Sequence, residues 1–322
     1  MIEEKPKYSD WSLDDDVVST FMKRFNVPGF AKDVLNRIFY KEEVQFISAL
    51  DTDIFTAEQA GDVLKNICSI SADVFLANMY RRGVISYTGE DRKAYSIADL
   101  YVRLDVMGVT EQEQYRSIPK EMQKKLADWS FHQFLNDLDP DPNAVPTQDE
   151  ILPLEDMLKF MDSQGDRPVY TNNCDCKSLN GECGMPRDVC ITYKTKVNSY
   201  VDRGAAKKIT PEEAKAIVRR ADNAGLMHTK NRNGICNCCG DCCVLFRGQK
   251  VRGSKGIWPV QHYLISYNAE SCKQCGLCIK RCWMGVFTKN IDGKIEADPS
   301  KCVGCGICAT KCPGKALTLK SI

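Results

Sequence analysis

Two cysteine runs near the C-terminus decide the fold of that region: residues 272–282 read CKQCGLCIKRC, and residues 302–313 read CVGCGICATKCP. A [4Fe–4S] cluster needs four thiolates at the corners of one compact core. The C-x-x-C-x-x-C spacing turns three sulfurs inward from one tight loop, and the fourth must come from elsewhere. The doubled run therefore predicts two [4Fe–4S] clusters. Zinc sites with four cysteines favour two C-x-x-C pairs separated by a longer spacer, which fits these runs poorly.

The two runs also repeat outside their cysteines, since Gly276 matches Gly306. Over roughly residues 260–322 the chain resembles the bacterial-type two-[4Fe–4S] ferredoxins, in which each run supplies the fourth ligand of the other cluster. One departure is Trp283, which stands where the second run has Pro313. The resemblance implies two ligand sets: Cys272, Cys275, Cys278 and Cys312 for the first cluster, and Cys302, Cys305, Cys308 and Cys282 for the second.

The distribution of cysteines indicates where the protein works. Seventeen of the 18 cysteines follow residue 173, in ligand-like spacings, whereas disulfide scaffolds are small secreted domains. The first residues, MIEEKPKYSDW, lack the apolar core of a signal peptide, and no apolar stretch approaches the ~20 residues that span a bilayer. We therefore expect a soluble protein in a reducing cytoplasm. Exposed clusters are oxygen-sensitive, which favours an anaerobic host.

The net charge of +1 conceals two halves of opposite sign. Residues 1–150 hold 17 basic and 27 acidic side chains, and residues 151–322 hold 27 and 16. Iron–sulfur clusters with four thiolates carry negative charge, so the basic half is interpreted as a counter-charge for buried clusters rather than as a nucleic-acid surface.

Residues 1–137 predict an acidic helical domain. Apolar spacing indicates helices over residues 14–50, and Thr56 begins a further helix with a capping-box sequence. A helix from Ser71 that stops at Gly83 is followed by a predicted hairpin. Two short helices and a hairpin are typical of a winged helix.

A winged helix can bind DNA or serve as a docking scaffold. The basic residues available for DNA are few: Arg81, Arg82, Arg92 and Lys93. Because the surrounding half is acidic, we do not expect DNA binding, and we expect the domain to dock a partner or a second copy of the chain.

The rest of the chain divides into three parts. Residues 138–165 begin with a stretch rich in proline and acidic residues, which predicts a linker. Residues 166–256 form a cysteine-rich iron–sulfur module, and residues 257–322 form the ferredoxin-type domain. The expected fold class is therefore α+β throughout, with a helical, winged-helix-like N-terminal domain.

Nine further cysteines lie in the middle module in two groups. The first group is Cys174, Cys176, Cys183 and Cys190, and the second is Cys236, Cys238, Cys239, Cys242 and Cys243. Between the groups, Thr210 and Pro211 begin a helix that ends at Gly225. This order is similar to a family of iron–sulfur proteins of anaerobes with a Gly-Leu-x-His step and a CNCCGxCC run. The resemblance implies electron transfer but no named substrate.

Spacing leaves the ligation of these nine cysteines open. The first group suffices for a third cluster, and the second could hold a fourth with one thiolate spare. Adjacent cysteines send their side chains in different directions, so the two groups could instead share one site. Zinc at the first group and a dithiol at Cys238–Cys239 or Cys242–Cys243 are further alternatives.

The sequence thus predicts a multicluster iron–sulfur protein that relays single electrons at low potential between a donor protein and a larger redox enzyme. No residue is expected to be catalytic. Two alternatives belong to other classes: a redox-sensing winged-helix transcription regulator, and a redox enzyme with an open iron or an active dithiol near His228.

Overall fold

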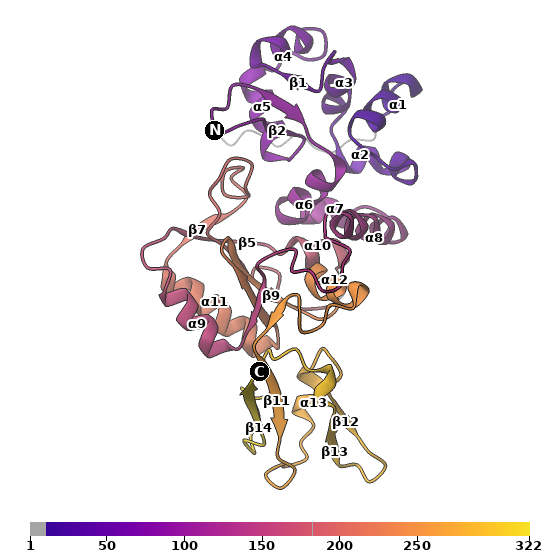
Figure 1. The fold of residues 1–322 in the computed structure, drawn as a ribbon. Coiled ribbons are helices and arrows are strands. Elements are labelled where there is room, and N and C mark those ends of the chain that lie inside the picture. The colour runs from indigo at the N-terminus through magenta and orange to yellow at the C-terminus, as the bar shows by residue number, and fades with distance from the viewer. Residues whose placement is uncertain (1–10, 182) are drawn as a thin grey trace. The chain divides into compact units, whose positions relative to one another are not determined.

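The computed structural model describes residues 11–181 and 183–322, which divide into two compact units (Figure 1). Unit 1 holds the residues up to 133 together with residues 178–180 and 194–206, and unit 2 holds the remainder. The expectation of a missing signal peptide rests largely on residues 1–10, which lie outside the described residues. Within the described part of the chain, none of the helices is long and apolar enough to cross a membrane.

Unit 1 combines helices with one small sheet. Its helices are α1 (Asp15–Arg24), η1 (Gly29–Val34), α2 (Leu35–Ile38), α3 (Lys41–Ala49), α4 (Ala57–Leu64), α5 (Ala72–Arg81), α6 (Leu100–Thr110), α7 (Gln112–Arg116) and α8 (Lys120–Asn136), which runs to the boundary. Its strands are β1 (Ile54–Phe55), β2 (Ile85–Tyr87) and β3 (Tyr95–Ile97). They form an antiparallel sheet in the order β1-β3-β2.

Local sequence signals explain the middle of unit 1. The Thr56 hydroxyl accepts a hydrogen bond from the backbone N–H of Gln59, whose side chain returns one to Thr56, so the expected capping box starts α4. Helix α5 is followed by Gly83, whose φ of +74° suits only glycine, and the expected hairpin follows as β2 and β3. The winged-helix assignment of this region stays a prediction.

A buried ion network ties the helices of unit 1 together. Arg82 pairs with Glu43 at 2.7 Å and with Glu111 at 2.7 Å. Arg103, whose side chain is fully buried, pairs with Glu111 at 2.8 Å and donates to the carbonyl oxygens of Ile38 and Arg82. The charges are compensated because every guanidinium faces a carboxylate or a carbonyl oxygen.

Residues 194–206 form part of unit 1, although the residues on both sides of them in the sequence belong to unit 2. Asn198 accepts from the backbone N–H of Tyr87 at 2.9 Å and donates to the carbonyl oxygen of the same residue at 2.9 Å. Buried Arg203 donates to the carbonyl oxygen of Ile85 and to the hydroxyl of Ser86. This segment therefore extends the hydrogen bonding of the hairpin strand β2.

Unit 2 is built on a seven-stranded sheet in the order β10-β4-β8-β9-β6-β5-β7, antiparallel except for the parallel pair β10–β4. These strands are β4 (Glu150–Leu152), β5 (Val169–Asn172), β6 (Cys190–Thr192), β7 (Lys207–Ile209), β8 (Met227–Asn231), β9 (Gly234–Cys238) and β10 (Val260–Gln261). The accompanying helices are α9 (Leu154–Asp162), α10 (Asp175–Asn180), α11 (Pro211–Ala224) and α12 (Val244–Arg252). Helices α9 and α11 lie side by side against the sheet (Figure 1).

The segment predicted as a linker contributes β4 and α9 to unit 2. Its acidic residues are satisfied inside the unit, because buried Asp149 accepts from Asn231 at 2.8 Å and Glu150 accepts from His262 at 2.9 Å. Trp258, which is fully buried, donates to the hydroxyl of Thr147. The proline-rich residues 138–147 themselves carry no helix or strand and are mostly exposed, and the regular elements begin at β4.

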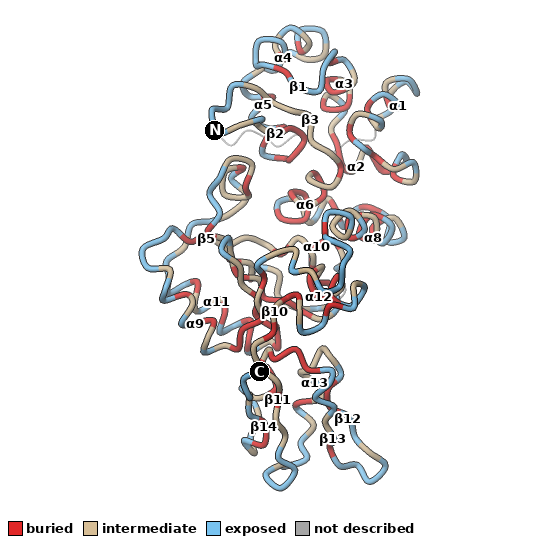
Figure 2. Tube along the Cα trace, in the orientation of Figure 1, coloured by how far each residue is buried: buried red, intermediate tan, exposed pale blue. Residues whose placement is uncertain are grey.

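The C-terminal part of unit 2 carries two small antiparallel ladders, β11 (Tyr263–Tyr267) with β14 (Leu317–Ser321) and β12 (Phe287–Lys289) with β13 (Ile295–Ala297). Helix α13 (Leu277–Arg281) and the turn η2 (Pro299–Lys301) complete it. The tip of the β12–β13 hairpin is exposed (Figure 2). The internal repeat extends to the backbone, because matched positions share a positive φ: Gln274 (54°) with Gly304 (73°), Gly276 (74°) with Gly306 (76°), and Gly285 (67°) with Lys315 (49°).

The ion network gives a prediction for stability. Arg103→Met removes one of the two guanidinium partners of Glu111 and leaves the buried carbonyl oxygen of Arg82 without its Arg103 donor, so we expect the free energy of unfolding to fall by about 3–5 kcal/mol. Urea unfolding of the full chain under anaerobic conditions, followed by far-ultraviolet circular dichroism, measures this change. The control Arg81→Met, at an exposed position of α5, should change it by less than about 0.5 kcal/mol. Equal effects of the two variants would contradict the assignment.

Candidate metal centres

The eight C-terminal cysteines surround two hollows. Cysteines that line the first are Cys272, Cys275, Cys278, Cys308 and Cys312. Cysteines that line the second are Cys282, Cys302, Cys305 and Cys308. The first hollow thus has three cysteines of the first run and two of the second, and the other hollow has three of the second run and one of the first, so Cys308 lines both. The division of these cysteines into two ligand sets stays a prediction. Four convergent thiols in an otherwise apolar hollow fit the ligand requirement of a [4Fe–4S] cluster.

Backbone N–H groups donate to the sulfurs of both sets. The N–H of Gln274 lies 3.4 Å from Cys272 Sγ, and the N–H of the matched Gly304 lies 3.3 Å from Cys302 Sγ. Val286 donates in the same way to Cys282 Sγ at 3.5 Å. Such bonds stabilise negative charge on sulfur and are one of the means by which a protein sets a cluster potential.

The two runs differ in exposure. The loop of the first run faces solvent, and Cys275 is exposed. The loop of the second run is buried, with Val303 and Ile307 in one core cluster with Cys238 and Cys243 of the middle module. Burial raises the pKa of the Cys305 thiol to about 12. The second hollow therefore lies against the middle cysteines, and the first lies towards solvent.

The nine middle cysteines gather in two sets that cut across their grouping in the sequence. Six form a ring of neighbouring thiols, which we call the six-thiol ring: Cys176, Cys174, Cys190, Cys236, Cys238 and Cys243. The other three form a separate set, which we call the three-thiol group: Cys183, Cys239 and Cys242. Cys183 thus leaves its sequence neighbours and joins two cysteines of the second group.

Strand register assembles the six-thiol ring. Strand β6 pairs with β9 through Ile191 and Ile235, so Cys190 comes next to Cys236. Cys236 and Cys238 are two residues apart on β9 and share one face of the sheet. Cys238 Sγ lies 3.2 Å from Cys243 Sγ, at the start of α12. Hydrogen bonds with Cys190 and Cys238 lower the pKa of Cys236, which favours the thiolate, the form of cysteine that binds metal.

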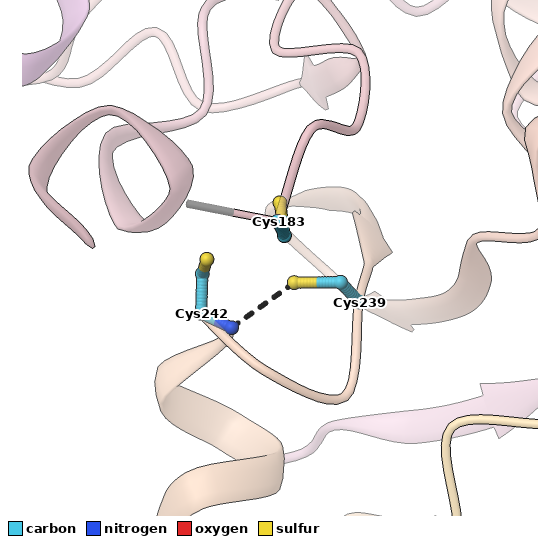
Figure 3. Close-up of side chains that lie close together, drawn as sticks. All are labelled: Cys183, Cys239 and Cys242. Carbon is cyan, nitrogen blue, oxygen red and sulfur yellow. Dashed lines mark hydrogen bonds between the residues drawn. The ribbon is translucent and has the colours of Figure 1, made fainter. Parts of the chain in front are cut away.

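The three-thiol group is compact. The Sγ atoms of Cys183, Cys239 and Cys242 all lie within 4.8 Å of one another, and the N–H of Cys242 donates to Cys239 Sγ at 3.1 Å (Figure 3). The hydrogen bond with Cys242 lowers the pKa of Cys239 to about 5. Adjacent cysteines diverge as expected, because Cys238 and Cys243 belong to the ring while Cys239 and Cys242 face Cys183.

A lysine is buried beside the six-thiol ring. The Nζ of Lys177 is 2.6 Å from the carbonyl oxygen of Asn237, and the residue is 1% exposed. Burial alone lowers its pKa, but the surrounding thiols, Cys174 and Cys190 foremost, reverse this and raise the pKa above its ordinary value. Lys177 therefore places a positive charge where a cluster bound by thiolates would be negative.

Comparison with known proteins identifies a family for the C-terminal region. The family of 4Fe–4S binding domains matches residues 295–318. The chain is 41% identical over 73 residues to pyruvate synthase subunit PorD of Methanothermobacter marburgensis, which is 23% of this chain and 83% of that subunit. The chain belongs to the 4Fe–4S ferredoxin-type family. Its ferredoxin-type domain is the part that carries the doubled cysteine run.

Two further relatives match shorter stretches of this chain. The ferredoxin-like protein YdhY of Escherichia coli, named as uncharacterized, is 33% identical over 60 residues, or 18% of this chain and 29% of YdhY. A protein of Nitratidesulfovibrio vulgaris is 39% identical over 49 residues, or 15% of this chain and 13% of the relative. The chain thus spans less than a third of the length of these two relatives. No solved structure matches it.

Sequence reasoning missed two features of these centres. The separation of Cys183 depends on α10, which includes Cys176 and ends at Gly181 in a left-handed turn with φ of +76°, ahead of Cys183. A glycine seven residues after Cys174 was a usable signal for that turn. The burial of Lys177 had no signal in the sequence, because lysines are mostly exposed and a lysine next to cysteines is normally expected at the surface.

Gly304 gives a prediction for the second hollow. A Cβ at Gly304 would meet the carbonyl oxygen of Tyr263 at 2.2 Å, so Gly304→Ala must displace the loop that carries Cys302 and Cys305. We expect this variant to lose about four irons per chain. The control Gly293→Ala has a similar φ, +75°, but open space around it, and should keep its iron. Iron and sulfide analysis of anaerobically purified protein distinguishes the two.

Lys177 gives a prediction for potential. Lys177→Met removes a positive charge beside the ring, which disfavours the more negative reduced state of a cluster there. We expect the midpoint potential of one paramagnetic signal to fall by on the order of 60 mV, equivalent to about 1.4 kcal/mol for one electron. A reductive titration followed by electron paramagnetic resonance measures it. The exposed Lys250→Met on α12 is the control, and an equal shift there would refute the local effect.

Proposed function

We propose that this protein relays single electrons at low potential between a donor protein and a larger redox enzyme. The observation that carries the proposal is the pair of hollows, each lined by three cysteines of one run together with at least one of the other. We assign one [4Fe–4S] cluster to Cys272, Cys275, Cys278 and Cys312, and another to Cys302, Cys305, Cys308 and Cys282. Bound there, such clusters supply one-electron chemistry, within a family range of roughly −700 to +450 mV.

A third cluster is assigned to the six-thiol ring. Four thiolates suffice for one [4Fe–4S] cluster. Cys190, which contacts both Cys174 and Cys236, is assigned as one of the four ligands, and two of the other ring cysteines are surplus. The ring contributes Cys238 and Cys243 to the same core as Val303 and Ile307 of the second run. The order of the centres in unit 2 is then the solvent-facing first hollow, the second hollow and the ring. On this proposal an external partner docks at the loop around exposed Cys275.

The identity of that partner class is supported by one relative. PorD is named as a subunit of pyruvate synthase, and the matched segment covers 83% of it. By analogy we propose that this chain serves as the electron-transfer component of an oxidoreductase system. A reducing cytoplasm suits the proposal, because thiolates there stay available as ligands.

We infer that unit 1 is a winged-helix-like docking domain. Helices α4 and α5 are followed by the β2–β3 hairpin, in the expected order. Two of the four basic residues that DNA would need are engaged within unit 1, because Arg82 pairs with Glu43 and Arg92 with Asp202. The hairpin binds residues 194–206 of the chain itself. These contacts favour protein docking, to a partner or a second copy, over DNA binding.

The cluster count tests the proposal directly. Three clusters predict about twelve irons and twelve sulfides per chain after anaerobic purification, and spectra that change in one-electron steps during reductive titration. Cys190→Ser, in the ring, should lower the count by about four, whereas Cys68→Ser, at a cysteine of unit 1, should not change it. About eight irons in the unmodified protein would contradict the proposal of a cluster at the ring, and fewer than eight would contradict the electron-relay proposal itself.

A further inference from the structure

The three-thiol group has the dimensions of a site for one metal ion. Its Sγ atoms lie within 4.8 Å of one another. Tetrahedral zinc with Zn–S bonds of about 2.3 Å places its sulfurs about 3.8 Å apart. Around a [4Fe–4S] cluster each thiolate binds a different iron, so the sulfurs stand farther apart.

The ferredoxin-type domain serves as an internal comparison. All eight of its cysteines lie in the described part of the chain, and no three of them gather within 4.8 Å. The cysteines of the ferredoxin-type domain are thus spread, whereas among the described residues the three-thiol group is the one set of three thiols that all lie within 4.8 Å of one another. The other close set, Cys174, Asp175 and Cys176, includes a carboxylate and belongs to the six-thiol ring.

We propose that Cys183, Cys239 and Cys242 bind a single zinc ion, separate from the iron–sulfur clusters. Soft thiolate ligands select zinc among the common divalent ions. We assign the fourth ligand to exposed Asp241, whose Oδ2 lies 3.8 Å from Cys242 Sγ. Rotation of this surface side chain brings its carboxylate onto the ion, which completes a four-coordinate structural site.

The surroundings favour a structural ion. Cys239 and Cys242 are almost completely buried and pack with Val189, Ala221 and Leu226, which are fully buried. Thiolates in such an apolar setting are costly unless a cation compensates them. The ion supplies that charge and fixes the turn between Cys239 and Cys242.

The fixed turn holds the ferredoxin-type domain in place. A Cβ at Gly240, in this turn, would lie 2.5 Å from the Cβ of Trp283, so the backbone at Gly240 lies directly against the Trp283 side chain. The Trp283 indole donates to the carbonyl oxygen of Gly225 at 2.7 Å. Trp283 directly follows Cys282, a predicted ligand of the second cluster. The zinc site therefore anchors the loop that carries Cys282 to the cysteine-rich module.

Metal analysis of the full chain, purified without oxygen and passed over a chelating resin, tests the proposal. We expect one tightly held zinc per chain. Cys183→Ser should lose this zinc and keep its iron, whereas the ring variant Cys190→Ser should lose iron and keep zinc. Cys183 is chosen because it is only half-buried, so its substitution disturbs packing least. Loss of about four irons from Cys183→Ser, or the absence of tightly bound zinc, would overturn the proposal.

A second measurement covers the case in which Cys183→Ser does not fold. Asp241→Asn changes only an exposed side chain and should weaken zinc binding about tenfold or more, measured by competition with a chromogenic chelator. Cobalt substituted for zinc should show thiolate-to-metal charge-transfer absorption. If Asp241→Asn binds zinc with wild-type affinity, the assignment of Asp241 as the fourth ligand is wrong. If the cobalt-loaded protein lacks that absorption, the proposal of a thiolate metal site is wrong. Neither result alters the iron count, so the electron-transfer proposal is judged separately.

Discussion

Pairing of β9 with β6 on one side and β8 on the other sets the positions of Cys190, Cys236 and Cys238, the strand-borne half of the six-thiol ring. Because side chains alternate along a strand, Cys236 and Cys238 share one face of β9, and Asn237 lies on the other. There Asn237 Oδ1 lies 2.6 Å from the Nδ1 of buried His228, the residue opposite it on β8. A slip of one residue would exchange the two faces and bury an amide where the ring needs sulfur.

Compensation of charge follows from this arrangement. A site of many thiolates is unfavourable in a buried setting unless cations accompany it. The chain provides Lys177 next to the ring and an excess of basic residues in the half that carries metal, 27 against 16 acidic side chains. In unit 1 the buried charges are compensated differently, because Arg82 and Arg103 form ion pairs with Glu43 and Glu111.

Much of the structure could be predicted from local signals. The capping residues Thr56 and Thr210, the glycine at position 225 and the hairpin of β2 and β3 all act within a few residues, and each lies where its sequence indicated. The ferredoxin-type repeat was equally legible, because its spacing encodes the loop geometry. The partition of the nine middle cysteines was not, since it depends on pairing between strands that are far apart in sequence. The burial of β4 and of residues 194–206 depends likewise on distant partners such as Asn231 and Tyr87.

The structure explains why Trp283 stands in the first run where the second run has Pro313. In the second run Pro313 follows the last cysteine, is exposed and restricts the chain there. In the first run the equivalent position contacts the cysteine-rich module, and a proline side chain could not donate a hydrogen bond to Gly225. The Trp283 indole makes this bond, and the Trp283 side chain packs on Gly240. Arg281, two residues earlier, adds to this contact by donating to the carbonyl oxygen of Asp222, and it also donates to that of Ile307. A symmetric two-cluster domain has thus been made asymmetric at the side where it joins the rest of unit 2, and the contacts that do so lie next to the three-thiol group.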